Sequence, residues 1–259
     1  MKFTTTELSL LATQYIWPFI RIAALVSVAP IFGTHTVPAR VKIIISLALT
    51  IIVAPILPKM EYVDPLSLVG LITVFHQVLI GVAIGFIVTL IFGALIIGGQ
   101  LVAQLMGLGF ASMMDPQNGV SVPVIGQLYT ILATLIFLGL NGHLILLDTL
   151  VGSFKSLPIG EFSLLPEKIW QMLQWSEWLF AAALSMALPS ITALLLVNIA
   201  FGVMTRASPQ LNIFAIGFPI TILLGFIVIL MTLPYFSPKV QQLFDQAFFF
   251  LKHTLLTRN

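Results

Sequence analysis

Between residues 65 and 114 the chain carries no Asp, Glu, Lys or Arg, so 50 consecutive residues lack a formal charge. As one straight α-helix this run would extend about 75 Å at 1.5 Å per residue. A helix needs only about 20 apolar residues to cross the ~30 Å hydrocarbon core of a bilayer. The run must therefore bend back, divide into two helices, or leave the membrane under the cover of other protein.

Charge is scarce in the rest of the sequence as well. Charged residues make up 8% and hydrophobic residues 59% of the 259 residues, whereas a soluble domain averages about 25% charged residues. Further uncharged runs cover residues 43–58, 116–147, 178–205 and 207–238. The pattern excludes an ordinary water-soluble globule and predicts an all-α integral membrane protein or a subunit of a larger apolar assembly. No hydrophilic linker interrupts it, so we expect a single domain over residues 1–259.

The uncharged runs and the turn residues between them predict the order of the helices. We expect helices at about 7–31, 41–57, 66–106, 123–150, 176–206 and 211–233, followed by an amphipathic segment at 238–257. The stretch 66–106 is either one long helix or a hairpin. A loop is expected at 107–122 and a more polar connection at 152–168. Irregular backbone does not face lipid inside the hydrocarbon region, so any break must be covered by protein or line a cavity.

The expected loop at 107–122 combines turn residues with bulky apolar ones. The loop contains Gly107, Gly109, an Asp-Pro pair and an Asn-Gly pair, all of which are typical of turns. It also contains Phe110, Met113 and Met114, which are apolar and deformable. A loop in water would not carry three such residues. Two interpretations remain, a re-entrant packing loop and a soft plug that a passing chain pushes aside. The candidate plug residues are Gly107, Leu108, Gly109, Phe110, Ala111, Met113, Met114, Asp115 and Pro116.

Five residues inside the expected helices are further candidates. Arg21 has no acidic residue within one turn, which favours a structural ion pair or a helix cap to another subunit over a proton or ion path. An intramembrane charge nevertheless raises the question of function. Gly81 and Gly85 form a Gly-x-x-x-Gly pair, a spacing that lets two helix backbones approach closely. Gln100 and Gln104 share one helix face and either hydrogen-bond a neighbouring helix or line a wet channel.

Polar residues near two turns complete the candidate set. His143 follows an Asn-Gly turn and is expected to hydrogen-bond at an interface. Arg206, Pro209 and Asn212 are expected to fix a tight turn, because they suit a helix end, a break and a helix start in that order. No group of residues has the spacing of a metal or catalytic site, so we expect no cofactor and no enzymatic activity. Lys and Arg do not cluster on one face, so nucleic acid is not an expected partner.

An ordered set of short motifs covers nearly the whole chain. They are Arg21 through Pro30 with Pro38 ahead of Lys42; Gly81-x-x-x-Gly85-Phe86; Gly107-Leu108-Gly109-Phe110-Ala111 with Asp115-Pro116; Asn141-Gly142-His143; Ala187-Leu188-Pro189; and Arg206-Ala207-Ser208-Pro209-Gln210-Leu211-Asn212-Ile213-Phe214 with Gly217-Phe218-Pro219. The last of these is the most specific. With these motifs the sequence resembles the FliR family of export-gate subunits in bacterial flagellar type III secretion and its injectisome counterparts.

The resemblance implies a function that composition does not. Members of this family form an export gate with FliP- and FliQ-type subunits, in a helical, cone-shaped assembly partly above the bilayer plane on the periplasmic side. It implies a structural, channel-forming subunit of the flagellar basal body in the inner membrane, which passes unfolded flagellar proteins. The resemblance also implies that the chain contacts FlhB-type switch proteins, FlhA-type export proteins and membrane lipid. Long kinked helical hairpins would face other subunits, and residues 107–119 would belong to the channel plug.

Two other classes of function compete with the export gate. A small secondary transporter or channel would normally show paired intramembrane charges or symmetric broken helices, and an intramembrane enzyme would need a nucleophile with a positioned base. Neither pattern is evident in the sequence. Purification in mild detergent separates the first two classes, because a transporter runs as a monomer or symmetric homo-oligomer and a gate subunit needs heteromeric partners.

Overall fold

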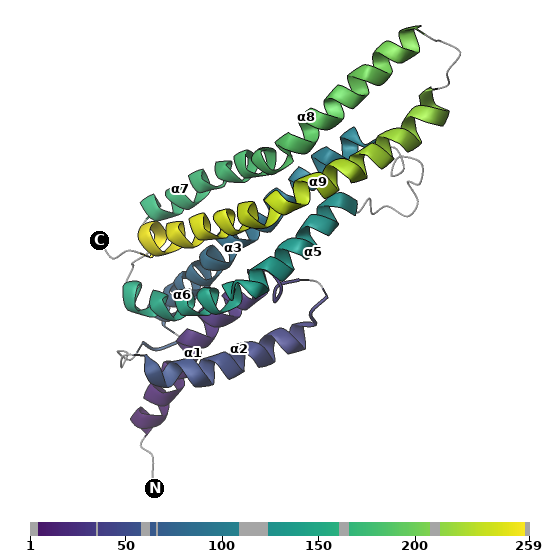
Figure 1. Cartoon of the computed structure of the whole chain (residues 1–259). Helices are drawn as coiled ribbons and strands as arrows, with labels where there is room; N and C mark the ends of the chain where they lie inside the picture. Colours follow the sequence, from purple (N-terminus) through teal and green to yellow (C-terminus); the bar gives the residue numbers. More distant parts are fainter. Residues whose placement is uncertain are drawn as a thin grey trace. The chain divides into compact units, whose positions relative to one another are not determined.

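The computed structural model describes residues 5–34, 36–57, 63–65, 67–108, 124–160, 166–207 and 213–256 (Figure 1). The regular elements in these ranges are α1 (Thr5–Val28), α2 (Ala39–Val53), η1 (Ala54–Ile56), α3 (Leu68–Leu105), α5 (Val124–Gly139), α6 (Gly142–Ser156), α7 (Pro166–Trp175), α8 (Glu177–Ala207), α9 (Ile213–Phe250) and η2 (Leu251–Leu255). All of them are helical. The prediction of an all-α protein is therefore confirmed.

Several of these helices are long and apolar enough to cross a membrane. Four stretches in the described part of the chain qualify, namely Ala39–Ile56, Leu68–Leu105, Pro166–Ala207 and Gly217–Leu255. A fifth is added if α5 and α6 are counted together as one broken span. The helices therefore agree with the membrane-type protein that the scarcity of charge predicted.

α3 settles the choice between one long helix and a hairpin. It is a single helix of 38 residues, about 57 Å long at 1.5 Å per residue. Gly93, Gly98 and Gly99 lie inside this helix and give room for neighbours. A Cβ atom at Gly98 would lie 3.0 Å from the carbonyl O of Ala183, and one at Gly99 would lie 2.5 Å from the Cα of Gly126. These glycines therefore permit close packing and do not interrupt the helix.

Two other expectations about helix boundaries were wrong. The expected helix at 123–150 is broken, because Asn141 takes a left-handed conformation with φ 56° between α5 and α6. Asn adopts this conformation more readily than most residues. The expected helix at 211–233 and the segment at 238–257 form one continuous α9, which runs through Pro234 and Pro238. A proline inside a helix removes one hydrogen bond and can bend the helix without ending it.

The chain folds into two compact units that alternate along the sequence. The first consists of Met1–Leu90, Asn141–Ser176 and Asp245–Asn259, and the second of Ile91–Leu140 and Glu177–Phe244. The divisions fall inside α3 and α9 or at helix ends, so no hydrophilic linker marks them. The single domain over residues 1–259 stays a prediction.

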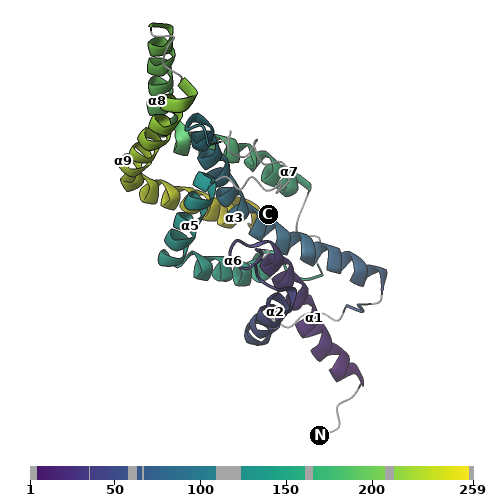
Figure 2. The ribbon, with the colours of Figure 1, turned by 90° about the vertical axis from the view of Figure 1, so that its right-hand side faces the viewer.

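Each unit has its own apolar core. In the first unit α1 and α2 pack side by side, as both views show (Figures 1 and 2), and Trp17 and Ile22 of α1 have no exposed surface. In the second unit Phe92 of α3, Phe137 of α5 and Phe244 of α9 form a cluster. Their ring centroids are 5.0 to 6.2 Å apart, within the range of favourable aromatic pairs. These cores hold the helices that carry the candidate site residues.

Candidate functional site

Arg21 lies at the centre of the first unit and is fully buried. Its Nε donates to Oε1 of Gln77 on α3 at 2.7 Å, and its Nη1 donates to Oγ of Ser153 on α6 at 3.0 Å. Its Nη2 donates to the carbonyl O of Leu157 at 2.8 Å. The ring of Phe154 lies against the guanidinium, with the centroid 4.2 Å from Cζ. One side chain therefore joins α1, α3 and the end of α6.

The partners of Arg21 are neutral groups. Leu157 directly follows the last residue of α6, where the carbonyls at a helix C-terminus carry partial negative charge that favours a cation. The planar fork of donors on an arginine suits a three-way contact of this kind, which the single ammonium of lysine cannot reproduce. These contacts fit a structural role for Arg21, but the cap forms on a helix of the same chain and not on another subunit.

Gly81 and Gly85 lie on the face of α3 that meets α1. A Cβ atom at Gly81 would overlap the carbonyl O of Arg21, and one at Gly85 would lie 3.1 Å from the backbone nitrogen of Ala29, directly after α1. Four residues further along, Oγ1 of Thr89 donates to the carbonyl O of Val28 at 2.9 Å. Small residues at four-residue spacing thus bring the two helices backbone to backbone in the first unit.

The candidate plug begins where α3 ends. The amide N of Leu108 donates to the carbonyl O of Ala103, and that of Gly107 donates to the carbonyl O of Gln104, each at 3.0 Å. This pair of bonds is a Schellman cap, which places Gly107 at the left-handed position after the helix. Gly107 has φ +82°, and a Cβ atom there would lie 2.8 Å from the ring of Phe218. Both the backbone and the space at this position therefore require glycine.

The other candidate plug residues lie outside the described part of the chain. They are Gly109, Phe110, Ala111, Met113, Met114, Asp115 and Pro116.

Helices α8 and α9 hold the end of α3 in the second unit. Nδ2 of Asn198 on α8 donates to the carbonyl O of Leu105 at 3.1 Å, one of the terminal carbonyls that lack a helical partner. Met106 is fully buried and lies against Gly225 of α9, where a Cβ atom would overlap its side chain. A cavity of about 280 Å³ borders this end, with Gln104 among its lining residues. The start of the candidate plug is thus fixed by three helices.

Gln100 and Gln104 are exposed in the described structure. Over residues 79–105 of α3, all of which are described, the only other exposed residue is Ile96. The remaining residues of this stretch are buried or half-buried. Gln104 is exposed beside the cavity of about 280 Å³, which it lines together with residues of α8 and α9. Both alternatives for the two amides, a partner helix and a wet channel, remain compatible with their position.

The candidate residues near turns are only partly within the described ranges. His143 is half-buried at the start of α6, and its Nδ1 is buried without a hydrogen-bond partner among the described residues. The hydrogen bond expected for it at an interface stays a prediction. Arg206 is exposed in the last turn of α8, where a cation complements the terminal carbonyls. Pro209 and Asn212 lie outside the described residues.

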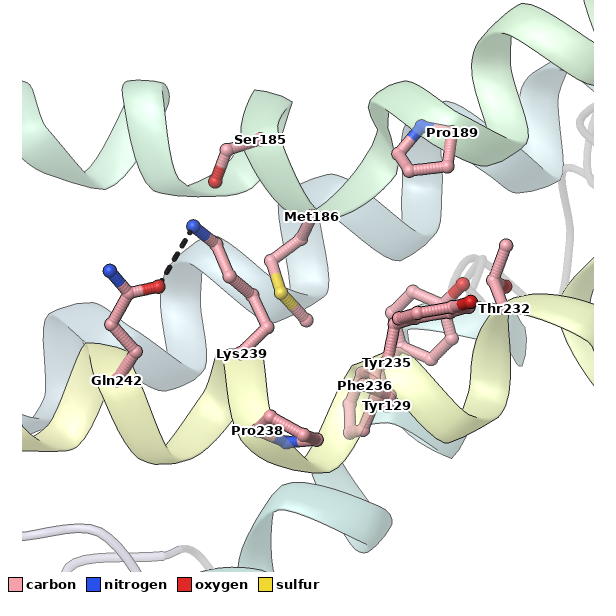
Figure 3. Close-up of a pocket in the computed structure, with 10 residues that line it drawn as sticks. All are labelled: Tyr129, Ser185, Met186, Pro189, Thr232, Tyr235, Phe236, Pro238, Lys239 and Gln242. Atoms are coloured by element: carbon pink, nitrogen blue, oxygen red, sulfur yellow. Dashed lines mark hydrogen bonds between the residues drawn. The ribbon is translucent and has the colours of Figure 1, made fainter.

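The second unit contains a further cavity that the sequence analysis did not single out. It has a volume of about 460 Å³ and lies between α5, α8 and α9 (Figure 3). It is lined by Tyr129, Ser185, Met186, Pro189, Thr232, Tyr235, Phe236, Pro238, Lys239 and Gln242. Its signal in the sequence is a lysine at residue 239 that directly follows the uncharged run 207–238, combined with prolines inside two helices.

Comparison with known proteins identifies the family. The profile of the family described as "Bacterial export proteins, family 1" matches residues 12–247. The chain belongs to this family. It is 36% identical over 248 residues to the flagellar biosynthetic protein FliR of Pectobacterium carotovorum subsp. carotovorum, which covers 96% of this chain and 95% of that protein. The same-named protein of Escherichia coli (strain K12) is 38% identical over 234 residues, or 90% and 89% of the two chains.

More distant members agree with this assignment. The flagellar biosynthetic protein FliR of Bacillus subtilis (strain 168) is 30% identical over 233 residues, which is 88% of each chain. The resemblance to the FliR family that the motifs indicated is therefore confirmed over most of the length. In this FliR-family chain, three of those motifs coincide with close contacts, namely the Arg21 network, the Gly81 and Gly85 packing, and the cap at Gly107.

Proposed function

We propose that this chain is a structural, channel-forming subunit of the flagellar type III protein export gate. Its family makes it a component of the flagellar export apparatus. Beyond this, we propose that it assembles with FliP- and FliQ-type subunits, lies beside FlhB- and FlhA-type proteins, and passes unfolded flagellar proteins across the inner membrane. It acts by forming part of a passage, and no catalytic step is required of it.

The length of α3 carries this proposal. The helix is uncharged over all of its 38 residues. Even at a tilt of about 40°, a ~30 Å hydrocarbon core accommodates only about 39 Å of helix. About 18 Å of the ~57 Å helix would remain outside the hydrocarbon. An uncharged helix there is best covered by neighbouring subunits, which supports an assembly that rises above the bilayer plane on the periplasmic side.

The exposed apolar surface supports the same conclusion. On α2 and η1, the side chains of Ile44, Ile51, Ile52 and Ile56 are 64 to 68% exposed. A contiguous apolar face of this kind marks contact with lipid or with another protein. Membrane lipid and the FliP- and FliQ-type subunits are the occupants that we propose for such faces.

We further propose that residues 107–119 seal the channel at rest. The fixed end of α3, with its cap at Gly107 and the bond from Asn198, supplies a firm base for such a plug. Phe110, Met113 and Met114 supply apolar bulk, which can keep a narrow constriction dry and block ions without a charged barrier.

Co-purification tests the assembly. We expect a tagged chain expressed with FliP- and FliQ-type subunits to elute with both in one defined complex in mild detergent, and to aggregate when expressed alone. A well-folded monomer or homo-oligomer that ignores both subunits would contradict the export-gate assignment.

Membrane permeability tests the plug. We expect simultaneous alanine substitution of Phe110, Met113 and Met114 to leave an assembled complex that leaks small solutes. The matched control replaces the same three residues with leucine, which keeps the apolar bulk, and should stay tight. An assembled triple variant that is as tight as wild type would reject the plug.

A further inference from the structure

The 460 Å³ cavity between α5, α8 and α9 supports an inference that does not depend on the export channel (Figure 3). Its volume falls within the roughly 300–1,000 Å³ typical of small-molecule sites, which are mostly apolar with a few polar groups. Its walls include Met186, Pro189 and Phe236, and its charged lining residue is Lys239. All lining residues belong to the second unit.

Prolines explain why the helices leave a space here. Pro189 in α8 and Pro238 in α9 lie inside their helices and line the cavity. Each lacks the N–H that would bond the carbonyl four residues earlier, and each ring pushes the preceding turn away. On α8 this carbonyl belongs to Ser185, which lines the same cavity. The wall therefore combines apolar atoms with a backbone acceptor that has lost its usual helical donor.

Lys239 supplies the positive charge of the cavity. Its Nζ donates to Oε1 of Gln242 at 3.3 Å, the bond drawn in Figure 3. None of the ten lining residues is acidic, so the ammonium has only this neutral partner within the cavity wall. An anion is the ligand that would complement this arrangement, because charge-assisted hydrogen bonds are roughly twice as strong as neutral ones.

The position of Lys239 along α9 suits the head-group level of a bilayer. Residues 207–238 are uncharged, and α9 belongs to the apolar stretch Gly217–Leu255. Lys239 is the first charge after this run, and Tyr235, one turn earlier, has a side chain that is 77% exposed. Tyrosine and lysine are enriched where a helix passes from hydrocarbon to the polar interface.

We propose that this cavity binds an anionic phospholipid. Its phosphate accepts hydrogen bonds from Lys239, and one acyl chain lies along Met186, Pro189 and Phe236. A head group that carries hydroxyls, such as glycerol, donates to Oγ of Ser185, a residue of the cavity wall. A soluble phosphate shares the charge chemistry of the head group, but it would leave the apolar walls of the cavity unfilled.

Native mass spectrometry of the chain co-purified with its export partners tests this proposal. The complex, stripped of lipid in a neutral detergent, is titrated with phosphatidylglycerol, with phosphatidylcholine of the same acyl chains, and with sodium phosphate. We expect wild type to bind phosphatidylglycerol about tenfold more tightly than phosphatidylcholine. Lys239→Gln should abolish this preference. Lys155→Gln, which removes an exposed charge outside the cavity, is the matched control and should retain it.

A second variant keeps the test decisive if Lys239→Gln does not assemble. Ser185→Phe fills the cavity without removing the charge, and it should weaken the binding of both lipids. The proposal is overturned if wild type binds the two lipids equally, or if Ser185→Phe retains phosphatidylglycerol. Full displacement of the lipid by millimolar phosphate would identify a soluble phosphate site instead. A wild-type complex that binds no lipid would also overturn the proposal.

Discussion

Replacing Gly81 with alanine adds a methyl group where α1 and α3 meet backbone to backbone. The new Cβ would overlap the carbonyl O of Arg21 and lie 2.8 Å from the Cβ of Ala24. Neither atom is the far end of a flexible side chain, so one helix must move to make room. That movement would also strain the bond between Arg21 and Gln77, which spans the same two helices at 2.7 Å.

The expected magnitude follows from two opposing terms. Alanine favours a helix interior over glycine by about 1 kcal/mol, while overpacking a tight contact costs typically about 1–3 kcal/mol. Because backbone atoms form this contact, the cost at Gly81 should lie near the upper limit, which leaves a net loss of about 2 kcal/mol. Gly152 on α6 is the matched control, since nothing lies within 4 Å of a Cβ atom there. Gly152→Ala should therefore gain the helix preference of alanine, about 1 kcal/mol, without any packing cost.

The assay is the melting temperature of the assembled complex in mild detergent, followed by size-exclusion chromatography after heating. For a chain of about this size, 1 kcal/mol shifts Tm by roughly 2–4 °C. We therefore expect Gly81→Ala to melt about 4–8 °C below wild type, and Gly152→Ala to melt at or above wild type. If both variants shift in the same direction, or if Gly81→Ala is as stable as wild type, the close approach of α1 and α3 is refuted.

Three further predictions concern the buried polar contacts and the end of α3. Arg21→Lys should lower the free energy of unfolding by about 2–3 kcal/mol, because one ammonium cannot satisfy three separated acceptors; an unchanged Tm would contradict the three-way contact. Asn198→Leu should assemble but raise the permeability of cells to small solutes, since it frees the last turn of α3, whereas Gln127→Leu on the exposed face of α5 should not. Gly107→Ala should reduce the yield of complex, because its left-handed backbone costs about 1–2 kcal/mol in any other residue and Phe218 occupies the space; normal yield would argue against the cap.

The sequence predicted the extent of α3 better than its continuity. The uncharged run marked out the segment, but a helix that is apolar on all sides has no periodicity to show whether it is one piece. Glycine in such a helix serves either as a break or as a site of close approach. The choice depends on what lies opposite, here Ala183 and Gly126 at Gly98 and Gly99. These partners are far away in sequence, so local pattern could not decide between the two uses.

The same reason limits prediction of the candidate sites. Arg21 was identifiable as a buried charge, but its partners Gln77 and Ser153 lie 56 and 132 positions away. No spacing rule connects them. The cavity at Lys239 likewise needs three helices to close it, although its prolines and the lysine after an uncharged run are visible in the sequence. In contrast, the Asn-Gly turn before His143 was visible in the sequence, and this strong local signal of a break already conflicted with one helix over 123–150.

The exposed residues of α3 connect the internal packing to the proposed assembly. Between residues 79 and 105 the exposed residues of this helix are Ile96, Gln100 and Gln104, and the others are buried or half-buried. This strip is therefore the part of the stretch that a partner or a channel can reach most easily. An apolar partner would be poorly matched to two exposed amides, because each buried amide needs hydrogen-bond partners. A passing unfolded chain offers peptide groups at any register, so uncharged amides can bind it without selecting a sequence. For Gln100 and Gln104 we therefore propose the channel, and the interface stays the alternative.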